Sequence, residues 1–404
     1  MTSTGSIAAV TAALSQLPPS ESIPEEERLQ LLEALDKTRA AMEPPIMSVM
    51  NFCFAHQGIV GIRVAIEMGI FDALAAGGRS PQTIEQLAEK TQGDEKLLRA
   101  LSETTPVRLR ILRLLRTKNL VVETDDHTYQ PLPLALGFAT GSPLVEAIKH
   151  FYANMKASTS LNEYFKTNGY RNPDDAHGAP FQFAYNTKDH HFDWLQKNPE
   201  DQHAFNVVMG LNRQVEGVQW YDFYPVQDKL QVSPDRVRLV DVGGGLGHDV
   251  TGFKERFPDM PGRLVVEDLP VVIQDIVAPL ADGVEAVGCD MFREQPVQGA
   301  KAYYMRTVLH DWPDRQALQA LARIREAMAE DSVLLINENT LPERDASSFS
   351  VALDILMMEV YASLERTEKQ WIELLEQAGF KVVKVWRTEF QGVGSNALFE
   401  AVPV

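Results

Sequence analysis

The chain has 404 residues, 45% of them hydrophobic, and carries a formal net charge of −18 at pH 7. A chain of this length can bury a large core and is expected to form two or three domains. The excess of acidic residues argues against a nucleic-acid partner, because sequence-independent binding to a phosphate backbone requires lysine and arginine side chains that displace counterions.

The two cysteines and the hydropathy pattern indicate where the protein works. Cys53 and Cys289 lie far apart in the sequence, which argues against a disulfide framework and favours a reducing compartment. The N-terminal residues carry no basic segment ahead of an apolar one, and we find no run of about eighteen apolar residues that could span a bilayer. We therefore expect a soluble cytoplasmic protein with no membrane partner.

The first part of the chain predicts a flexible arm followed by a helical domain. Residues 1–23 are small and polar and contain prolines, so we expect an arm without regular structure. Residues 24–138 are expected to form one domain, which begins with a charged amphipathic helix over residues 25–42. Apolar residues recur at helical spacing over residues 46–75, which predicts largely buried helices, and Ser80-Pro81 is typical of a further helix start.

The end of this domain has the order of a winged helix. A helix over residues 108–116 is followed by two short strands, at 120–123 and 127–130, and Pro106 is expected to break or kink the preceding helix. Arginines alternate with leucines in this helix, so most of it must be buried and its charges belong to a solvated face. We therefore expect a domain used for dimerisation rather than for binding DNA.

Residues 139–230 predict a second helical region that is rich in aromatic side chains. Such a density suits the walls of a pocket for a flat apolar ligand, although packing in a core explains each aromatic residue about as well. The segment Asp189-His190-His191, followed by Asp193, invites a metal interpretation. Adjacent histidines on a regular element point in different directions, however, and no third ligand stands at a fixed spacing, so we expect no metal site.

From residue 231 to residue 404 strands and helices alternate, which predicts a doubly wound α/β domain. The ligand of such a sheet is expected outside the carboxyl ends of its strands. In chain order the expected elements are strand 237–242, a helix from 247, strand 263–268, helix 271–280, strand 284–288, strand 302–308, helix 314–329, strand 332–338, helices within 349–378, and strands 381–387 and 396–402.

A glycine-rich turn follows the first strand of this domain. Asp241 ends the strand, and Gly243, Gly244 and Gly245 follow, so bare backbone can approach a nucleotide-like cofactor. The dinucleotide pattern GxGxxG read from Gly243 would need a glycine where this chain has His248, which weakens an NAD or FAD interpretation. A tight turn without a ligand needs the same glycines, so the turn alone leaves both interpretations open.

The ends of the following strands carry residues that suit a nucleoside cofactor. Asp268 stands about twenty residues past the glycines, where a carboxylate can accept both ribose hydroxyls. Asp290 is suited to accept an adenine amine, and the thioether of Met291 is suited to pack on the ring face. The next two strand ends carry the segment from Arg306 to His310 and then Glu338.

Taken together, these motifs resemble those of the S-adenosylmethionine-dependent O-methyltransferases of the plant-type, caffeic-acid class and their fungal relatives. The resemblance covers roughly residues 45–404. It implies a Rossmann-like methyltransferase sheet preceded by a winged-helix dimerisation domain, a homodimer, S-adenosyl-L-methionine as cofactor and no metal. The most specific motifs are Asp241-Val-Gly-Gly-Gly-Leu-Gly, Asp268-Leu-Pro, Gly288-Cys-Asp-Met-Phe and His310-Asp-Trp.

The resemblance also implies roles for individual residues. His310 is expected to be the general base, with Glu338 and Glu365 flanking and orienting it. The residues expected to hold the cofactor are Gly243, Gly244, Gly245, Asp268, Asp290, Met291 and Arg306. Plant members have a lysine where this chain has Arg306, which is still a cation but has a different reach.

The chemistry of methyl transfer agrees with these roles. A neutral phenol is a poor nucleophile, and a histidine with a pKa near 6.5 is expected to be mostly unprotonated at pH 7 and able to take its proton. We therefore expect O-methylation of a phenolic or enolic hydroxyl on an aromatic or polyketide-like small molecule. Two alternatives stay open: a pericyclase or other rearrangement catalyst that binds the same cofactor without methyl transfer, and a winged-helix regulator. A buried structural role is the alternative for His310 itself.

Overall fold

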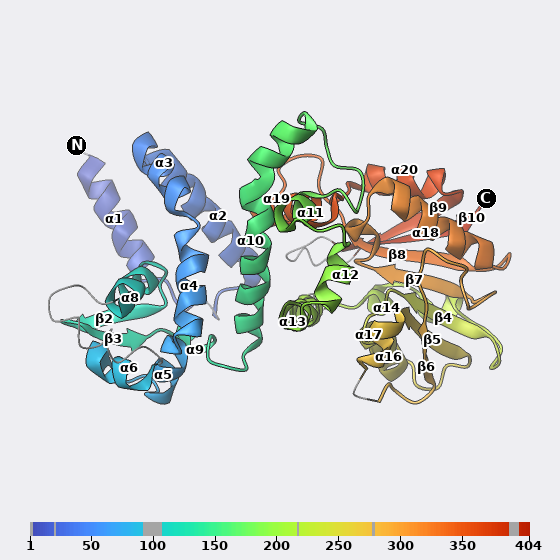
Figure 1. Ribbon diagram of the computed structural model, residues 1–404, viewed down its shortest axis with the longest axis horizontal. Coiled ribbons are helices and arrows are strands. Elements are labelled where there is room, and N and C mark those ends of the chain that lie inside the picture. The colour runs from blue at the N-terminus through green and yellow to red at the C-terminus, as the bar shows by residue number, and fades with distance from the viewer. Residues whose placement is uncertain (1–2, 20–21, 92–106, 216–217, 277–278, 388–395) are drawn as a thin grey trace.

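The computed structural model describes residues 3–19, 22–91, 107–215, 218–276, 279–387 and 396–404. Figure 1 shows an N-terminal part of helices with a small sheet, a middle group of helices around α10, and a C-terminal part built on a larger sheet. The expected kink at Pro106 lies outside the described residues.

The N-terminal part packs helices on a three-stranded sheet with the order β1-β3-β2 in the described residues. Leu112 and Leu115 are fully buried at its centre, so the helix that carries the arginines is amphipathic as expected. The elements are α1 Ser3–Ser15, α2 Glu25–Met42, α3 Pro45–Phe54, α4 Gln57–Glu67, α5 Ile70–Ala76, β1 Gln82–Thr83, α6 Ile84–Lys90, α8 Val107–Thr117, β2 Val121–Asp125, β3 Thr128–Pro131 and α9 Pro133–Leu136.

The structure corrects three expectations for the N-terminal residues. Residues 3–15 form helix α1 where we expected a flexible arm, because the segment is rich in alanine and lacks proline. Helix α3 was expected to be largely buried, yet none of its residues is buried. Finally, we expected no run that could span a bilayer, but among the described residues the 23 residues of Pro45–Glu67 are long and apolar enough to do so by length and composition. Only 17% of the most apolar window in this stretch is buried.

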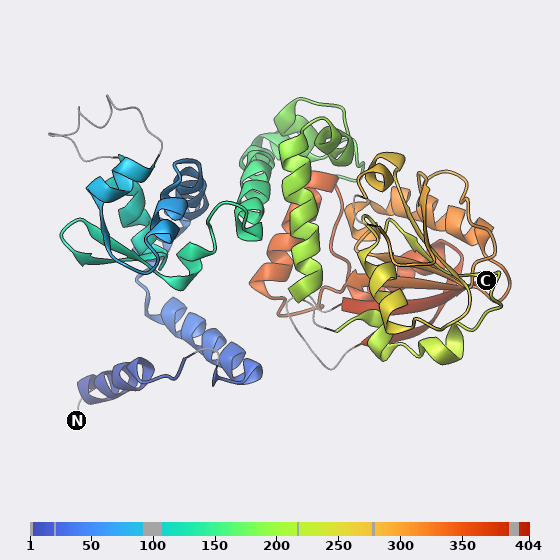
Figure 2. The ribbon, with the colours of Figure 1, turned by 90° about the horizontal axis from the view of Figure 1, so that it is seen from below.

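That apolar stretch is not one continuous helix. A turn separates α3 from α4 at residues 55–56, and α4 buries Gly58, Gly61 and Ala65 against the rest of the domain. Figure 2 shows α1 and α2 lying away from the C-terminal sheet. The apolar residues of α3 therefore form an exposed surface of the N-terminal part. The composition of Pro45–Glu67 alone is weak evidence that this stretch spans a membrane.

The middle helices stand between the N-terminal part and the large sheet (Figure 1). The long helix α10 begins where the Ser142 hydroxyl accepts a hydrogen bond from the Leu144 amide, and it ends at Gly169, whose φ of 71° is left-handed. The elements are α10 Pro143–Asn168, α11 Pro180–Tyr185, α12 His191–Gln196, α13 Pro199–Val215, α14 Trp220–Phe223 and α15 Val226–Lys229.

The C-terminal part contains a seven-stranded sheet with the order β6-β5-β4-β7-β8-β10-β9 among the described residues. Strands β4 to β8 pair in parallel, and β10 pairs antiparallel with both β8 and β9. The elements are β4 Val237–Val242, α16 His248–Arg256, β5 Arg263–Asp268, α17 Pro270–Gln274, β6 Val284–Gly288, β7 Ala302–Arg306, η3 Leu309–Asp311, α18 Asp314–Ala327, β8 Val333–Asn339, α19 Ser348–Tyr361, α20 Glu368–Gln377, β9 Phe380–Arg387 and β10 Asn396–Pro403.

Helices cover both faces of this sheet, which confirms the doubly wound α/β fold. All six residues of β4 and all five of β7 are buried, as is typical of central parallel strands. Leu321 and Trp371 come from α18 and α20 on one face, and Trp220 and Phe253 come from α14 and α16 on the other. Because β4 lies between β5 and β7, the chain reverses direction across the sheet at the glycine turn, which is where such folds bind ligands.

Candidate active site

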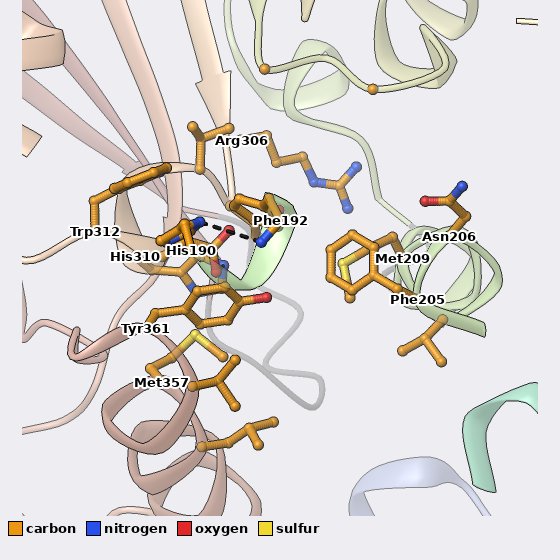
Figure 3. Close-up of a pocket in the computed structure, with 18 of the residues that line it drawn as sticks. His190, Phe192, Phe205, Asn206, Met209, Arg306, His310, Trp312, Met357 and Tyr361 are labelled. Carbon is orange, nitrogen blue, oxygen red and sulfur yellow. Dashed lines mark hydrogen bonds and ion pairs between the residues drawn. The ribbon is translucent and has the colours of Figure 1, made fainter. Parts of the chain in front are cut away.

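A cavity of about 1770 Å³ opens at the carboxyl ends of β4, β5 and β7. Its other walls come from α10, α12, α13 and α19, so the aromatic middle helices face the sheet across it. Figure 3 shows His310 on one side of this cavity and Phe205 with Met209 on the other. The glycine turn and His310, the expected base, therefore line the same cavity.

The glycine turn has backbone conformations that only glycine adopts easily. Gly243 and Gly245 have φ values of 72° and 59° and line the cavity. The Gly243 and Gly244 amides donate to the Glu267 carbonyl at 2.8 and 3.0 Å, which fixes the turn against β5. Gly244 is not among the described cavity-lining residues, and a Cβ there would stand 2.7 Å from the Asp241 carboxyl group. Gly244 thus allows close packing, whereas Gly243 and Gly245 leave the cavity floor bare.

Two acidic residues at neighbouring strand ends also line the cavity. Asp268 accepts hydrogen bonds from the Gly245 amide at 2.8 Å and from the Leu269 amide at 2.7 Å, so its carboxylate is fixed at the end of β5. Asp290 accepts from the Phe292 amide at 3.0 Å. Carboxylate oxygens have several lone pairs, so both residues keep acceptor capacity for a ligand's hydroxyl or amine.

These residues together fit a nucleoside cofactor. Met291 follows Asp290 directly, lines the same cavity and offers a soft thioether for a flat base. The bare backbone of the turn accommodates a group that a Cβ would exclude. The chain thus brings Gly243, Gly245, Asp268, Asp290 and Met291 to one wall, as the motif spacing suggested.

Arg306 lines the same cavity but is tied to a neighbouring acid. Its Nη1 lies 2.7 Å from Asp249 Oδ1, and the two side chains are 4% and 5% exposed. Asp249 is in the first turn of α16, just after the glycine turn. The guanidinium therefore joins the end of β7 to that helix, an interaction that a shorter lysine would make with one point charge only.

His310 stands in the short helix η3, directly after β7, and also lines the cavity. Its Nδ1 lies 2.7 Å from Glu365 Oε1, and its Nε2 lies 3.5 Å from Asp311 Oδ1. The Glu365 amide donates in turn to Asp354 Oδ1 at 2.8 Å, which fixes the segment after α19. Glu365 therefore holds one ring nitrogen, and Nε2 is the atom able to exchange a proton with a ligand.

Glu338 makes a different contact from the one expected. Its Oε1 accepts hydrogen bonds from the amides of Val308 at 3.0 Å and Leu309 at 2.9 Å, and the side chain is fully buried at the end of β8. These bonds satisfy the first amides of η3 and fix the backbone that carries His310. Glu338 thus positions the turn, whereas Glu365 contacts the imidazole.

The charges around His310 overturn one expectation. Burial lowers the pKa of His310, but the carboxylates of Asp311, Glu365 and Glu338 outweigh burial and raise the pKa to about 10. Burial also raises the pKa of Asp311 to about 6 and that of Glu338 to about 7, against the positive charge of His310. The three acids therefore favour the protonated form of the ring, whereas the sequence led us to expect a mostly neutral ring.

An aromatic wall stands beside the base. Trp312 stacks on His190 with ring centroids 4.5 Å apart and planes 9° apart, and Phe192 and Tyr361 pack nearby. The sequence predicted an aromatic-rich region at residues 139–230 but singled out none of these four as a cavity residue. Nothing in their spacing marks them, because they come from α12, η3, α19 and the residues that flank α12 and η3, and meet only in the folded chain.

The two histidines of the segment at residues 189–193 contact aromatic side chains. His191 is 2% exposed, and its Nδ1 lies 3.0 Å from the Tyr361 hydroxyl. Across the residues that the structure describes, no group of three or more His, Cys, Asp or Glu side chains is placed to hold a metal ion.

The fold and the cavity define a Rossmann-like methyltransferase, and comparisons with known proteins identify the family. The family model of the O-methyltransferase domain matches residues 168–381, and that of the O-methyltransferase dimerisation domain matches residues 51–141. The chain therefore belongs to the S-adenosylmethionine-dependent O-methyltransferases, with S-adenosylmethionine as its cofactor.

Relatives match over most of the chain. Methyltransferase cfoC of Aspergillus candidus is 34% identical over 90% of this chain and 88% of its own length. Demethylsterigmatocystin 6-O-methyltransferase of Aspergillus parasiticus is 31% identical over 82% of this chain and 83% of its own. Two solved structures, one described as a pericyclic reaction enzyme and one of LepI in complex with SAM, each superpose with a TM-score of 0.84 at 28% identity, covering 99% and 100% of this chain and 100% of their own.

Proposed function

We propose that this O-methyltransferase methylates a phenolic or enolic hydroxyl of an aromatic or polyketide-like small molecule, with His310 as the general base. The observation that carries this proposal is the placement of the His310 imidazole, bonded to Glu365 at 2.7 Å, in the same cavity as the glycine turn. The apolar and aromatic walls suit a flat acceptor. The relative that acts on demethylsterigmatocystin by name supports this class of substrate.

His310, Glu365 and Glu338 would each have a distinct role in this reaction. His310 Nε2 would take the proton of the acceptor hydroxyl as its oxygen becomes the nucleophile for the methyl group. When bound, S-adenosylmethionine supplies that electrophilic methyl group on a sulfonium, whose positive charge disfavours a protonated ring beside it. Glu365 stabilises the imidazolium that forms, and Glu338 keeps the turn in place.

The cofactor would rest on the wall built from the glycine turn and the acidic strand ends. Asp268, Asp290 and Met291 line the cavity, and we expect Asp268 to accept the ribose hydroxyls and Asp290 and Met291 to contact the adenine. Arg306 would act by holding α16 against β7 through Asp249. Holding the two reacting atoms in line is worth several kcal/mol in such displacements.

A labelling experiment tests the proposal against its alternative. The protein is incubated with cofactor that carries an isotopic methyl label and with a panel of hydroxylated aromatic and polyketide compounds, and products are analysed by mass spectrometry. Label on a product oxygen supports methyl transfer. The structural neighbour described as a pericyclic reaction enzyme favours a second candidate, a rearrangement catalyst. That reaction would consume substrate and leave the product without label.

The N-terminal part supports a homodimer as the working form. The match to a dimerisation domain begins at residue 51, and Phe52 and Phe54 at the end of α3 are 78% and 56% exposed. Apolar side chains exposed side by side usually mark a surface that another chain covers. With two free cysteines and no structural disulfide in the described residues, we expect the dimer to work in the cytoplasm.

A further inference from the structure

His190 is a buried histidine in the cavity wall that the proposed methyl transfer does not use. It is 3% exposed, lines the cavity and stands just before α12. Its ring lies flat against Trp312, which is two residues after His310, so the stack is built onto the turn that carries the base. Figure 3 shows the three side chains on the same side of the cavity.

The hydrogen bonding of His190 fixes which nitrogen carries its proton. The Phe192 amide lies 3.3 Å from Nδ1, and because an amide only donates, Nδ1 must accept. The hydrogen of the neutral ring is then on Nε2. Burial and the nearby charge of His177 lower the pKa of His190 to about 3, which keeps the ring neutral at physiological pH.

The N–H group at Nε2 has no partner among the described residues, although the atom is buried. A buried donor without an acceptor is costly and rare in folded proteins, and at a ligand site it commonly marks a group that the ligand satisfies. The face of the ring is occupied by Trp312, and the rings of Phe192 and Tyr361 lie tilted to it, with centroids 5.1 and 5.9 Å away. Because His190 lines the cavity, a small shift of the side chains that cover Nε2 would let a single acceptor atom of a ligand reach it and complete the site.

We propose that His190 Nε2 donates a hydrogen bond to a carbonyl oxygen of the acceptor substrate, so that the enzyme selects hydroxyl groups flanked by a carbonyl, as in acyl phenols and enolised diketones. In such compounds the hydroxyl proton is held in an internal hydrogen bond to the carbonyl. A protein donor at the carbonyl releases that hydroxyl for His310. This inference rests on the proposed function and adds the substrate class.

A matched pair of ligands tests the inference. Ortho-hydroxybenzophenone has the flanking carbonyl, and ortho-benzylphenol has a methylene in its place. We expect the wild-type protein to favour the ketone in kcat/KM by roughly tenfold, the usual size of one buried hydrogen bond. His190→Phe keeps a ring to stack on Trp312 and should bring the ratio of the two kcat/KM values close to one. His190→Gln retains an N–H donor and should restore part of the preference.

A binding measurement keeps the inference testable apart from catalysis. With S-adenosylhomocysteine present, both ligands are titrated by calorimetry, and the carbonyl stretch of the bound ketone is recorded by isotope-edited infrared spectroscopy. We expect a carbonyl frequency lowered in the wild type and returned toward its free value in His190→Phe. Equal affinity of the wild type for the two ligands, or the same frequency in both proteins, would overturn the inference. If neither ligand is methylated, the proposed function is in doubt, but the infrared result still decides the role of His190.

Discussion

Replacing Glu365 with glutamine should move the pH dependence of catalysis toward lower pH. Glu365 contacts His310 Nδ1 at 2.7 Å, and both side chains are buried. Two unit charges about 4 Å apart interact by roughly 4 kcal/mol at an effective dielectric constant of about 20, which corresponds to roughly three pKa units. Glutamine still accepts the hydrogen bond, and Asp311 and Glu338 remain, so we expect the pKa of His310 to fall by about one to three units from its raised value.

The sign of the effect follows from the role of the base. Only the unprotonated ring accepts a proton, so kcat/KM rises with pH through the pKa of His310 in the free protein, which is raised to about 10. The assay is the pH profile of kcat/KM for labelled methyl transfer, with Glu368→Gln as the control, because Glu368 is an acid on the exposed side of α20. An unshifted rising limb in Glu365→Gln, or one shifted to higher pH, would refute the electrostatic account of this site.

Three further predictions concern the structure around the site. Arg306→Ala leaves Asp249 buried without its guanidinium and should lower the free energy of unfolding by about 3 to 5 kcal/mol in denaturant titrations, with a smaller loss in Asp249→Asn. Gly243→Ala, at φ 72° with a Cβ 2.8 Å from Val308, should lower cofactor affinity in calorimetry. Gly78→Ala, at φ 64° with open space around its Cβ, should leave that affinity unchanged. Phe52→Asp should convert a dimer to monomers in sedimentation velocity while thermal melting remains cooperative, and a dimer that survives would contradict the proposed interface.

The sequence predicts the C-terminal sheet well because its signals are local. The short, valine-rich segment at residues 237–242 favours a buried strand, and the glycines that follow it favour a turn with positive φ. The order of chemically distinct strand ends then places Asp268, Asp290 and His310 around one cavity. Parallel strands present their carboxyl ends at one edge, so this convergence follows from topology alone.

Contacts between distant elements could not be predicted in the same way. Glu338 ends a strand next to β7, but only the folded chain shows that its carboxylate accepts two amides of η3 rather than contacting the imidazole. The raised pKa of His310 depends on Asp311, its neighbour in η3, together with Glu338 and Glu365, which only the fold brings close to the ring. The exposure of α3 was not predicted, because apolar periodicity indicates a buried helix face but does not tell whether this chain or another chain packs against that face.

The central claim is that His310 removes the proton of the acceptor hydroxyl. The most direct test is the single-turnover rate of methyl transfer by His310→Ala at saturating cofactor, with cofactor affinity measured by calorimetry on the same sample. The exposed His203 on α13 provides the matched control, His203→Ala. We predict a rate about 10² to 10⁴ times lower in His310→Ala with cofactor affinity retained. A wild-type rate, or loss of cofactor binding together with activity, would contradict the assignment of His310 as the base.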